Sequence, residues 1–429
     1  MTPQPFIRIL WVAITALLMT GCAQFRGKTP VLALQFSYDQ ANHAAAAAHV
    51  ELELNKSKQE PDVGLLMDLC AYFHYAGNYK RSNRACQMAA ARADDLYTKS
   101  IREQATSYLT SDNAISFQGE EYERLFLHVI GMLNYAAMNE PQSALVESRR
   151  LDNKIKYFTT NPEATPSQFK GDALGRYISG LLYEQSHENN DAFIDFQKAI
   201  RTFEVNPGIT VPNTLPHDAM RTARNHGMLD ESKKTQNEFN LIKKPAPLTP
   251  KSGEVIIVFE NGFSPYKYEL HNLPFQQVRH STINIARVKS LHTGEISQSE
   301  HVKDLTLLAK TRHEERMPEI RRKVAARETA RAVVSFGAGL LAWAAVGVKT
   351  GMAVGAVTSA VMSSLTQADL RSWNTLPAQV DLARLTLSPG KHDLAIKLYG
   401  HYGTELYRGV LKDVVIRPGK RTWLIQKLP

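Results

Sequence analysis

The chain has 429 residues, of which 43% are hydrophobic and 22% are charged, so its composition is that of a globular protein and excludes a mainly disordered one. Its length suffices for two or three domains with proper cores. The formal net charge of +9 is uneven, because residues 250–429 hold 25 Lys and Arg against 15 Asp and Glu, whereas the remainder holds 26 against 27. The basic part is compatible with nucleic acid, anionic lipid or an acidic polymer as a partner, and the compartment must decide between them.

The first residues have the architecture of a secretory signal. Arg8 precedes an apolar run from Ile9 to Met19, and small residues stand just before Cys22. The run is too short for a secure membrane span. The letters MTGC, which end at Cys22, resemble the lipobox of bacterial lipoproteins, in which the cysteine is acylated. We expect a signal peptide over residues 1–21, a lipidated Cys22 and a tether over residues 22–36; a plain signal peptide and an uncleaved anchor are the alternatives.

The resemblance to a lipobox also implies a location. An Asp directly after the cysteine would favour the inner membrane, and its absence before Ala23 and Gln24 points to the outer membrane, facing the periplasm. Several acyl chains, at about 0.8 kcal/mol per buried CH₂, would make such an anchor permanent. Nucleic acid is then excluded as a partner, which leaves phospholipid, cell-wall polymer or another envelope protein.

Residues 37–243 follow a helical pattern, with alanine-rich apolar positions at i, i+3 and i+4 spacing and few Gly or Pro inside the runs. The segment ALGRYISGLLYEQSHENNDAFIDFQKAIRTF resembles one tetratricopeptide unit. Small residues stand where two antiparallel helices would touch, and aromatic residues stand beside them, namely Gly180, Tyr183, Ala192, Phe196 and Ala199. Weaker copies lie over residues 65–94 and 130–152. Because their spacing is irregular, we expect a tetratricopeptide-like stack with insertions, and an unrelated helical bundle is the alternative.

Two cysteines remain once Cys22 is lipidated. In the first helical pair, Cys70 lies on the first helix and Cys86 on the second, about a turn from facing each other. The periplasm is oxidising, so a disulfide is geometrically plausible, with two buried thiols as the alternative.

Residues 244–252 contain three prolines and break the helical pattern, which predicts a linker. From residue 253 to 429 the segments are strand-like, with β-branched and aromatic residues and partial alternation. The sequence therefore predicts an α+β protein: an N-terminal tetratricopeptide-like α-solenoid followed by a small antiparallel β-sandwich or sheet domain. An apolar helical hairpin is inserted in this domain at about residues 301–366.

The predicted insertion begins with a long basic helix, which we expect to be interrupted near Pro318. An almost uncharged segment over residues 333–362 follows it, with Gly347, Gly351 and Gly355 on one helix face. Its apolar runs of 17 and 12 residues are shorter than a membrane span, so a hairpin turning near Lys349 fits best. Three destinations stay open: burial in the fold, contact between protomers in a homo-oligomer, and insertion into a membrane.

The run ADLRSWNTLPAQVDLARLTL follows this segment. With the lipobox and the helical half, it resembles a family of bacterial envelope lipoproteins over nearly the whole mature chain; Asp369, Arg371, Trp373, Leu376 and Pro377 carry the resemblance. It implies no catalytic activity. Asp369 and Arg371 are expected to pair or to cap the hairpin while Trp373 covers the sheet edge, and an anionic-polymer site is the alternative.

The sequence shows no recognised catalytic set. It lacks HExxH, a phosphate loop and a GxSxG elbow, and its histidines are scattered. The acidic run Glu120, Glu121 and Glu123 is as compatible with an exposed helix face as with an acid/base pair. We expect neither catalysis, nor a metal, nor a cofactor.

These features predict a periplasmic scaffold that binds another envelope protein in the concave groove of the helical half. Candidate partner-binding residues in that groove are Asn134, Tyr135, Tyr177 and Tyr183. One alternative is a membrane-inserting or secretion component that uses the glycine-rich hairpin. The other is a cell-wall-active enzyme.

Overall fold

In the computed structural model, the described residues are 32–33, 36–56, 60–103, 116–160, 171–206, 208–241, 249–279, 281–346 and 368–429. The signal peptide, Cys22, most of the tether and linker, and the glycines 347, 351 and 355 lie outside them. The predicted domain boundaries stay predictions.

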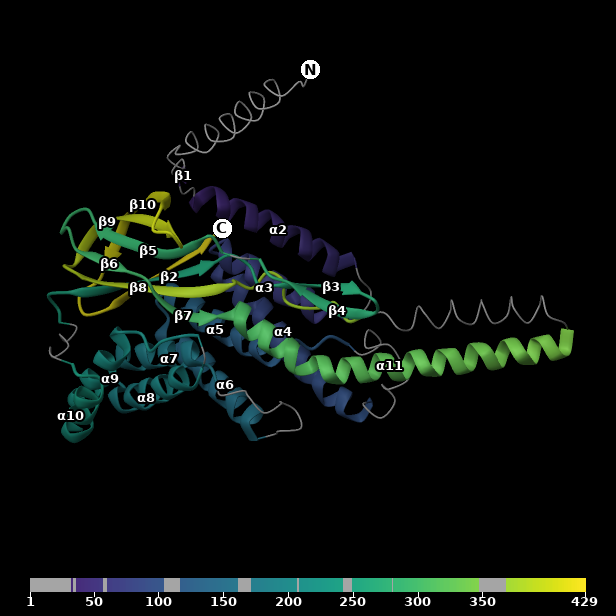
Figure 1. The fold of residues 1–429 in the computed structure, drawn as a ribbon. Coiled ribbons are helices and arrows are strands. Elements are labelled where there is room, and N and C mark those ends of the chain that lie inside the picture. The colour runs from purple at the N-terminus through teal and green to yellow at the C-terminus, as the bar shows by residue number, and fades with distance from the viewer. Residues whose placement is uncertain are drawn as a thin grey trace, which may run out of the picture.

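Helices fill the first half of the chain, and after α2 they form antiparallel pairs (Figure 1). Their bounds are α2 Phe36–Lys56, α3 Val63–Tyr75, α4 Tyr79–Glu103, α5 Glu121–Ala137, α6 Pro141–Thr160, α7 Ala173–Gln185, α8 Asn189–Val205, α9 Thr214–Asn225 and α10 Leu229–Glu238. Each pair turns on one residue with a positive φ, which closes the first helix: Gly77, Asn139, His187 and Gly227.

The pairs pack closely because small residues stand at their contacts. A Cβ added to Gly180 of α7 would lie 2.4 Å from the ring of Phe196 on α8. A Cβ on Gly175 would lie 2.4 Å from a methyl of Leu151 on α6. This packing is that of a tetratricopeptide-like stack, and the predicted fold class is confirmed.

The second half of the chain supplies the sheets. The strands are β1 Leu32–Ala33, β2 Gly253–Asn261, β3 Tyr266–Leu270, β4 Leu273–Gln277, β5 Ile283–Ser290, β6 Ile296–Gln298, β7 Glu300–Asp304, β8 Gln379–Leu387, β9 Gly390–Gly400, β10 Glu405–Ile416 and β11 Arg421–Leu428. One sheet has the order β1-β10-β9-β5-β6, another β11-β2-β8-β7, and β3 and β4 form a hairpin. Most neighbours are antiparallel as predicted, but β11 runs parallel to β2 and β1 parallel to β10.

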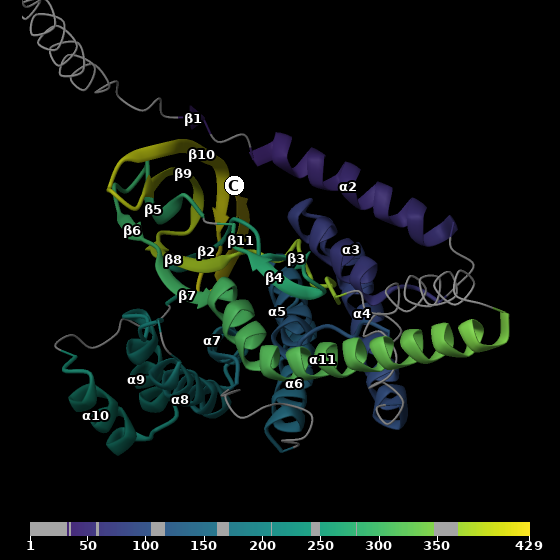
Figure 2. The same cartoon turned by 45° about the vertical axis from the view of Figure 1, so that its right-hand side comes forward.

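The run GEVIIVFEN of β2 is apolar almost throughout because both of its faces are buried. Val255 and Ile257 face the core between the two larger sheets, together with Leu394 and Ile396 of β9. The alternate residues of β2 belong instead to a core shared with the helices. The four-stranded sheet is therefore a middle layer between the second sheet and the helical stack (Figure 2).

The helices nearest this sheet are the first members of three pairs, α3, α5 and α7. Their apolar residues share one core with Ile256, Trp423 and Trp373. Hydrogen bonds cross the same boundary, for example from Arg421 Nη1 to the carbonyl of Leu181 at 2.7 Å. The sheets therefore cover the face of the stack that α3, α5 and α7 form.

Helix α11 spans Leu305–Val346 without the predicted interruption, although Pro318 lies inside it. Contacts on both sides of the proline hold the axis: Arg312 Nη2 donates to Glu121 at 2.6 Å, and Asn272 Nδ2 donates to Glu328 at 2.9 Å. The C-terminal part of the helix projects from the body (Figures 1 and 2). None of the described helices is both long enough and apolar enough to span a bilayer.

Candidate functional site: a groove between helices α4, α5 and α6

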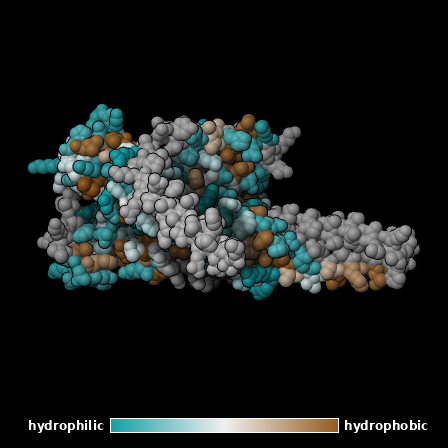
Figure 3. Space-filling view, turned by 45° about the horizontal axis from the view of Figure 1, so that its top comes forward, coloured by the Kyte–Doolittle hydropathy of each residue, from teal (hydrophilic) through white to brown (hydrophobic). Residues whose placement is uncertain are grey.

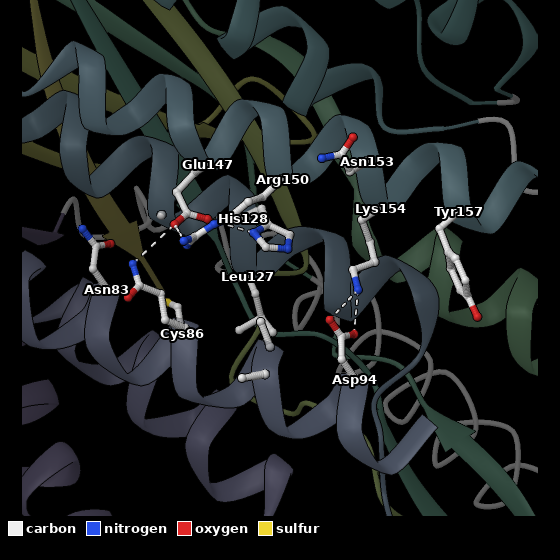
Figure 4. Close-up of a pocket in the computed structure, with 14 residues that line it drawn as sticks. Asn83, Cys86, Asp94, Leu127, His128, Glu147, Arg150, Asn153, Lys154 and Tyr157 are labelled. Carbon is white, nitrogen blue, oxygen red and sulfur yellow. Dashed lines mark hydrogen bonds and ion pairs between the residues drawn. The ribbon is translucent and has the colours of Figure 1, made fainter. Parts of the chain in front are cut away.

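A groove of about 560 Å³ opens where α4, α5 and α6 meet (Figure 4). It combines charged side chains of both signs, amides and a small apolar floor. The lining residues are Asn83, Cys86, Gln87, Ala90, Ala91, Asp94, Leu127, His128, Gly131, Glu147, Arg150, Asn153, Lys154 and Tyr157.

Glu147 of α6 organises one end of the groove. Its Oε2 lies 2.8 Å from Nδ1 of His128, and its Oε1 accepts from Arg150 Nη1 at 2.6 Å. Burial alone would raise the pKa of Glu147, but the hydrogen bond and charge of His128 and the charge of Arg150 hold it below its usual value. Glu147 is therefore a fixed negative charge beside a half-exposed guanidinium.

Helix α5 makes room for this carboxylate at Gly131. A Cβ at that position would lie 3.0 Å from Cγ of Glu147, which is tighter than ordinary packing. Glycine therefore lets Glu147 lie against the backbone of α5 and reach His128.

Asp94 of α4 organises the other end. Lys154 Nζ donates to both oxygens of Asp94, at 2.6 and 2.8 Å, and Arg124 Nη2 donates at 2.5 Å. Burial raises the pKa of this carboxyl, but Lys154 and Arg124 together hold it below its usual value. Burial also lowers the pKa of Lys154, against the opposing effect of Asp94. The groove thus has an ion pair at each end.

Amides lie between and beside these pairs. The Oδ1 of Asn83 accepts from Nδ2 of Asn134 at 2.8 Å, while its own Nδ2 has no partner among the described residues, although the side chain is only 5% exposed. Gln87 and Asn153 are exposed on the rim. Gln87 Nε2 also donates to Glu147 Oε1, at 3.4 Å. Amide donors and acceptors suit the peptide groups of an extended chain, which carry one donor and one acceptor per residue.

The ionisable groups of the groove are engaged with one another and form no nucleophile–base pair. Among the described residues there is also no group of three or more His, Cys, Asp or Glu side chains that could hold a metal ion.

Two of the predicted partner-binding residues do not lie on an open surface, so the expectation for them is corrected. Asn134 is fully buried, with its Oδ1 at 2.5 Å from Nδ1 of His74. Tyr177 is buried at the boundary with the sheets, where its hydroxyl accepts from Arg384 at 2.6 Å. Tyr135 and Tyr183 are half-buried against the core. The face predicted to bind a partner carries the chain's own sheets instead.

The remaining candidate residues have structural contacts. A disulfide joins Cys70 of α3 to Cys86 of α4, and Cys86 lies in the groove floor. Arg371 Nε donates to Asp369 at 2.8 Å. Trp373 lies in the shared core rather than at a sheet edge, and its backbone N–H donates to Glu123 at 2.8 Å.

The acidic run at the start of α5 fixes helix α11. Arg316 Nη1 donates to Glu120 at 2.5 Å. Burial opposes ionisation, but Arg316, Lys267 and Arg312 lower the pKa of Glu120 to about 2. Burial and the charge of Glu120 instead raise the pKa of Glu123 to about 7. This run is therefore a docking site for α11 within the chain.

Sequence reasoning missed the charged residues of the groove: Asp94, His128, Glu147, Arg150 and Lys154. They come from three helices, and on each helix they have the spacing of an ordinary polar face. Only the turn residues and the pairing of successive helices, which the sequence does indicate, would have placed them near one another.

No family model and no curated protein sequence matches the chain. Among solved structures, it is similar to "MamA", with 13% identity over 47% of this chain and 88% of that one, at a TM-score of 0.30. It is also similar to "BtubC (BKLC) from P. vanneervenii", with 8% identity over 47% of this chain and 72% of that one, at 0.31. A third similar structure is Bacillus thuringiensis PlcR "in complex with the peptide PapR7 and DNA". The identity is 13% over 47% of this chain and 64% of that one, at a TM-score of 0.27. Likeness at this level indicates nothing about a shared function.

Proposed function

We propose that the protein is a non-catalytic scaffold that binds an extended segment of another envelope protein in the groove between α4, α5 and α6. The observation that carries this proposal is the groove itself: about 560 Å³, open, with an ion pair at each end and amides between them. The face formed by α3, α5 and α7 is filled by the sheets, so a partner must use another face of the stack.

The place of action is the periplasmic face of the outer membrane, through a lipid on Cys22. This part of the proposal rests on the lipobox-like letters MTGC and on the residues that follow them. Replacing Cys22 with alanine should move the protein from the membrane fraction to the soluble fraction of the envelope. If this variant stays with the outer membrane, the proposed anchor is wrong.

Crosslinking within the envelope tests the groove. A photo-crosslinking amino acid at Asn153, on the groove rim, should capture a discrete partner. The same substitution at Asn237, an exposed asparagine on α10, is the matched control and should capture none. A second pair of variants, Asn153→Trp and Asn237→Trp, adds bulk to the groove or to the control position. If both positions capture the partner equally, or if Asn153→Trp does not weaken binding of the partner, the proposed site is wrong.

A second candidate function is contact with a membrane through the end of α11, and exposed apolar residues favour it. Val333, Phe336 and Leu340 recur at helical spacing and are 67, 75 and 48% exposed. They belong to the C-terminal part of α11, and Figure 3 shows hydrophobic residues along the arm that projects from the body. Arg321 and Arg322, which are exposed nearer the body, would face anionic headgroups.

Vesicle flotation distinguishes this function from contact between protomers. Full-length protein with Cys22→Ala should float with vesicles of phosphatidylglycerol, and changing Val333, Phe336 and Leu340 to serine should abolish flotation. The matched control replaces Leu291 and Ile296, which are 53 and 66% exposed on the sheet half. If light scattering shows that the serine variant instead converts a dimer to a monomer, the stripe is a protomer contact.

A further inference from the structure

Among the described residues, strand β11 is the last strand of its sheet, and its residues Trp423 and Ile425 are 3 and 8% exposed. It pairs with β2 in parallel, and no described strand lies on its other side. The N–H of Glu254 donates to the carbonyl of Lys420, and the N–H of Gly262 donates to that of Leu428. In a parallel pair of strands, the backbone N–H and C=O groups of alternate residues point to the neighbouring strand. These two bonds show that the even-numbered residues of β11 are the ones that bond to β2. The backbone groups of Trp423 and Ile425 therefore point away from β2, and no other backbone bond engages them among the described residues.

A second groove, of about 340 Å³, follows this edge. Its walls are β10, β11 and the C-terminal end of α5. Thr422, Leu424 and Gln426 of β11 line it and are half-buried. Thr422 Oγ1 donates to the carbonyl of Val415 on β10, at 2.8 Å. An added strand is recognised by main-chain hydrogen bonds along a strand edge and by the side chains beside that edge. This groove offers a strand edge together with apolar and polar side chains.

The rim of this groove is basic. Lys412 and Arg417 line it, are exposed, and have no ion-pair partner among the described residues. The carboxylate of Asp413 is engaged elsewhere, since it accepts from Lys391 at 3.3 Å. The rim therefore presents uncompensated positive charge to whatever lies along β11.

We propose that this edge is a second binding site, for an extended acidic polypeptide segment that adds as a strand beside β11. Alternate peptide groups of the segment bond to the outward N–H and C=O groups of Trp423 and Ile425. Alternate apolar side chains cover Leu424, and acidic side chains meet Lys412 and Arg417. A second copy of the chain fits less well, because a symmetric contact brings two basic rims together.

The test uses a labelled peptide with full-length protein and fluorescence anisotropy. The probe is acetyl-Glu-Val-Glu-Val-Glu-Val-amide, and its counterpart has Lys for each Glu. N-methylation of one set of alternate amides should weaken binding about tenfold or more, and methylation of the other set should change it little, because only one edge of a strand faces its neighbour. Equal effects of the two sets, or no binding of the unmethylated acidic peptide, overturn the proposal.

Charge reversal supplies an independent readout. The double variant Lys412→Glu with Arg417→Glu should weaken binding of the acidic peptide about tenfold and strengthen binding of the Lys peptide. Lys233→Glu with Lys289→Glu changes the net charge equally at exposed positions elsewhere and should have little effect. If both double variants weaken binding alike, the rim is not the site. Asn153→Trp should leave this binding unchanged, so that failure here is distinct from failure of the helical groove.

Discussion

At the scale of single residues, Asp218 is a buried carboxylate at the boundary between helices and sheets. Arg221 of the same helix donates to it at 2.6 Å and Arg384 of β8 at 3.1 Å, and all three side chains are buried. Glu184 and Glu254 complete a network with Arg421. Three guanidinium groups thus face three carboxylates, so each charge is compensated only while the others are present.

Asp218→Asn should therefore destabilise the protein strongly, by about 3–5 kcal/mol, because it leaves buried guanidinium charge uncompensated. Denaturant unfolding of the purified protein measures this change. The matched control is Asp230→Asn in α10, whose carboxylate pairs with Lys233 at the surface at 3.9 Å. A loss for Asp218→Asn no larger than that of this control would show that the network contributes little.

The same carboxyl predicts a pH dependence. Burial alone would raise the pKa of Asp218, but Arg384 and Arg221 hold it well below its usual value of 3.8. A depressed folded-state pKa gives stability that is present above the unfolded value and is lost as pH falls through the folded one. Between pH 5 and pH 3 the unfolding free energy should therefore fall less steeply in Asp218→Asn than in the wild type. Parallel thermal midpoints in this range would contradict the assignment.

At the scale of elements, the helical pairs depend on close contacts between small and aromatic residues. In the α7–α8 pair, Gly180→Ala would place a methyl 2.4 Å from the ring of Phe196. We expect a loss of about 1–3 kcal/mol through overpacking. Combining it with Phe196→Leu removes ring atoms from the same spot, so the double variant should lose less than the sum of the two single losses. Strict additivity of the unfolding free energies would show that the two residues do not compete for space.

The α3–α4 pair is also closed covalently. The disulfide between Cys70 and Cys86 joins residues 16 apart in sequence. Closing a loop of this size should contribute about 3 kcal/mol by restricting the unfolded chain. Thermal unfolding with and without reductant measures this contribution. The double variant Cys70→Ser with Cys86→Ser should have the same midpoint with and without reductant. An unchanged midpoint on reduction of the wild type would contradict this contribution.

At the scale of the whole molecule, the helical stack and the sheets share one core. Residues of α3, α5 and α7 are buried together with β2 and β11, and the buried His74 lies 3.1 Å from Glu260 of β2. Neither half can expose its side of this boundary without exposing a large apolar surface. The two halves are therefore expected to unfold as one unit.

Denaturant titration of the full chain tests this expectation. Helix content by circular dichroism and tryptophan emission, which includes Trp373 and Trp423 at the boundary, should give coincident midpoints. Two separated transitions would show that the halves are independent domains, as a linker between them by itself suggests.

Much of the secondary structure follows from the local sequence. The helical pairs, the strand segments and the neighbouring positions of Cys70 and Cys86 could be predicted, because apolar periodicity, turn residues and short separations act within one pair. The continuity of α11 through Pro318 could not, since contacts with Glu121 and Asn272 on either side of the proline decide it. The groove residues could not either, since three helices contribute them.

What the sequence by itself determined is which face of each helix and strand is apolar. What the tertiary structure alone decided is which other element covers that face. The inner side of the helical stack, expected to bind a partner, is covered by β2 and β11, and Arg421 reaches Glu184 across 237 positions of sequence. The physical reason is that local periodicity specifies an apolar surface, while the surface that buries it is chosen by the packing of the whole chain.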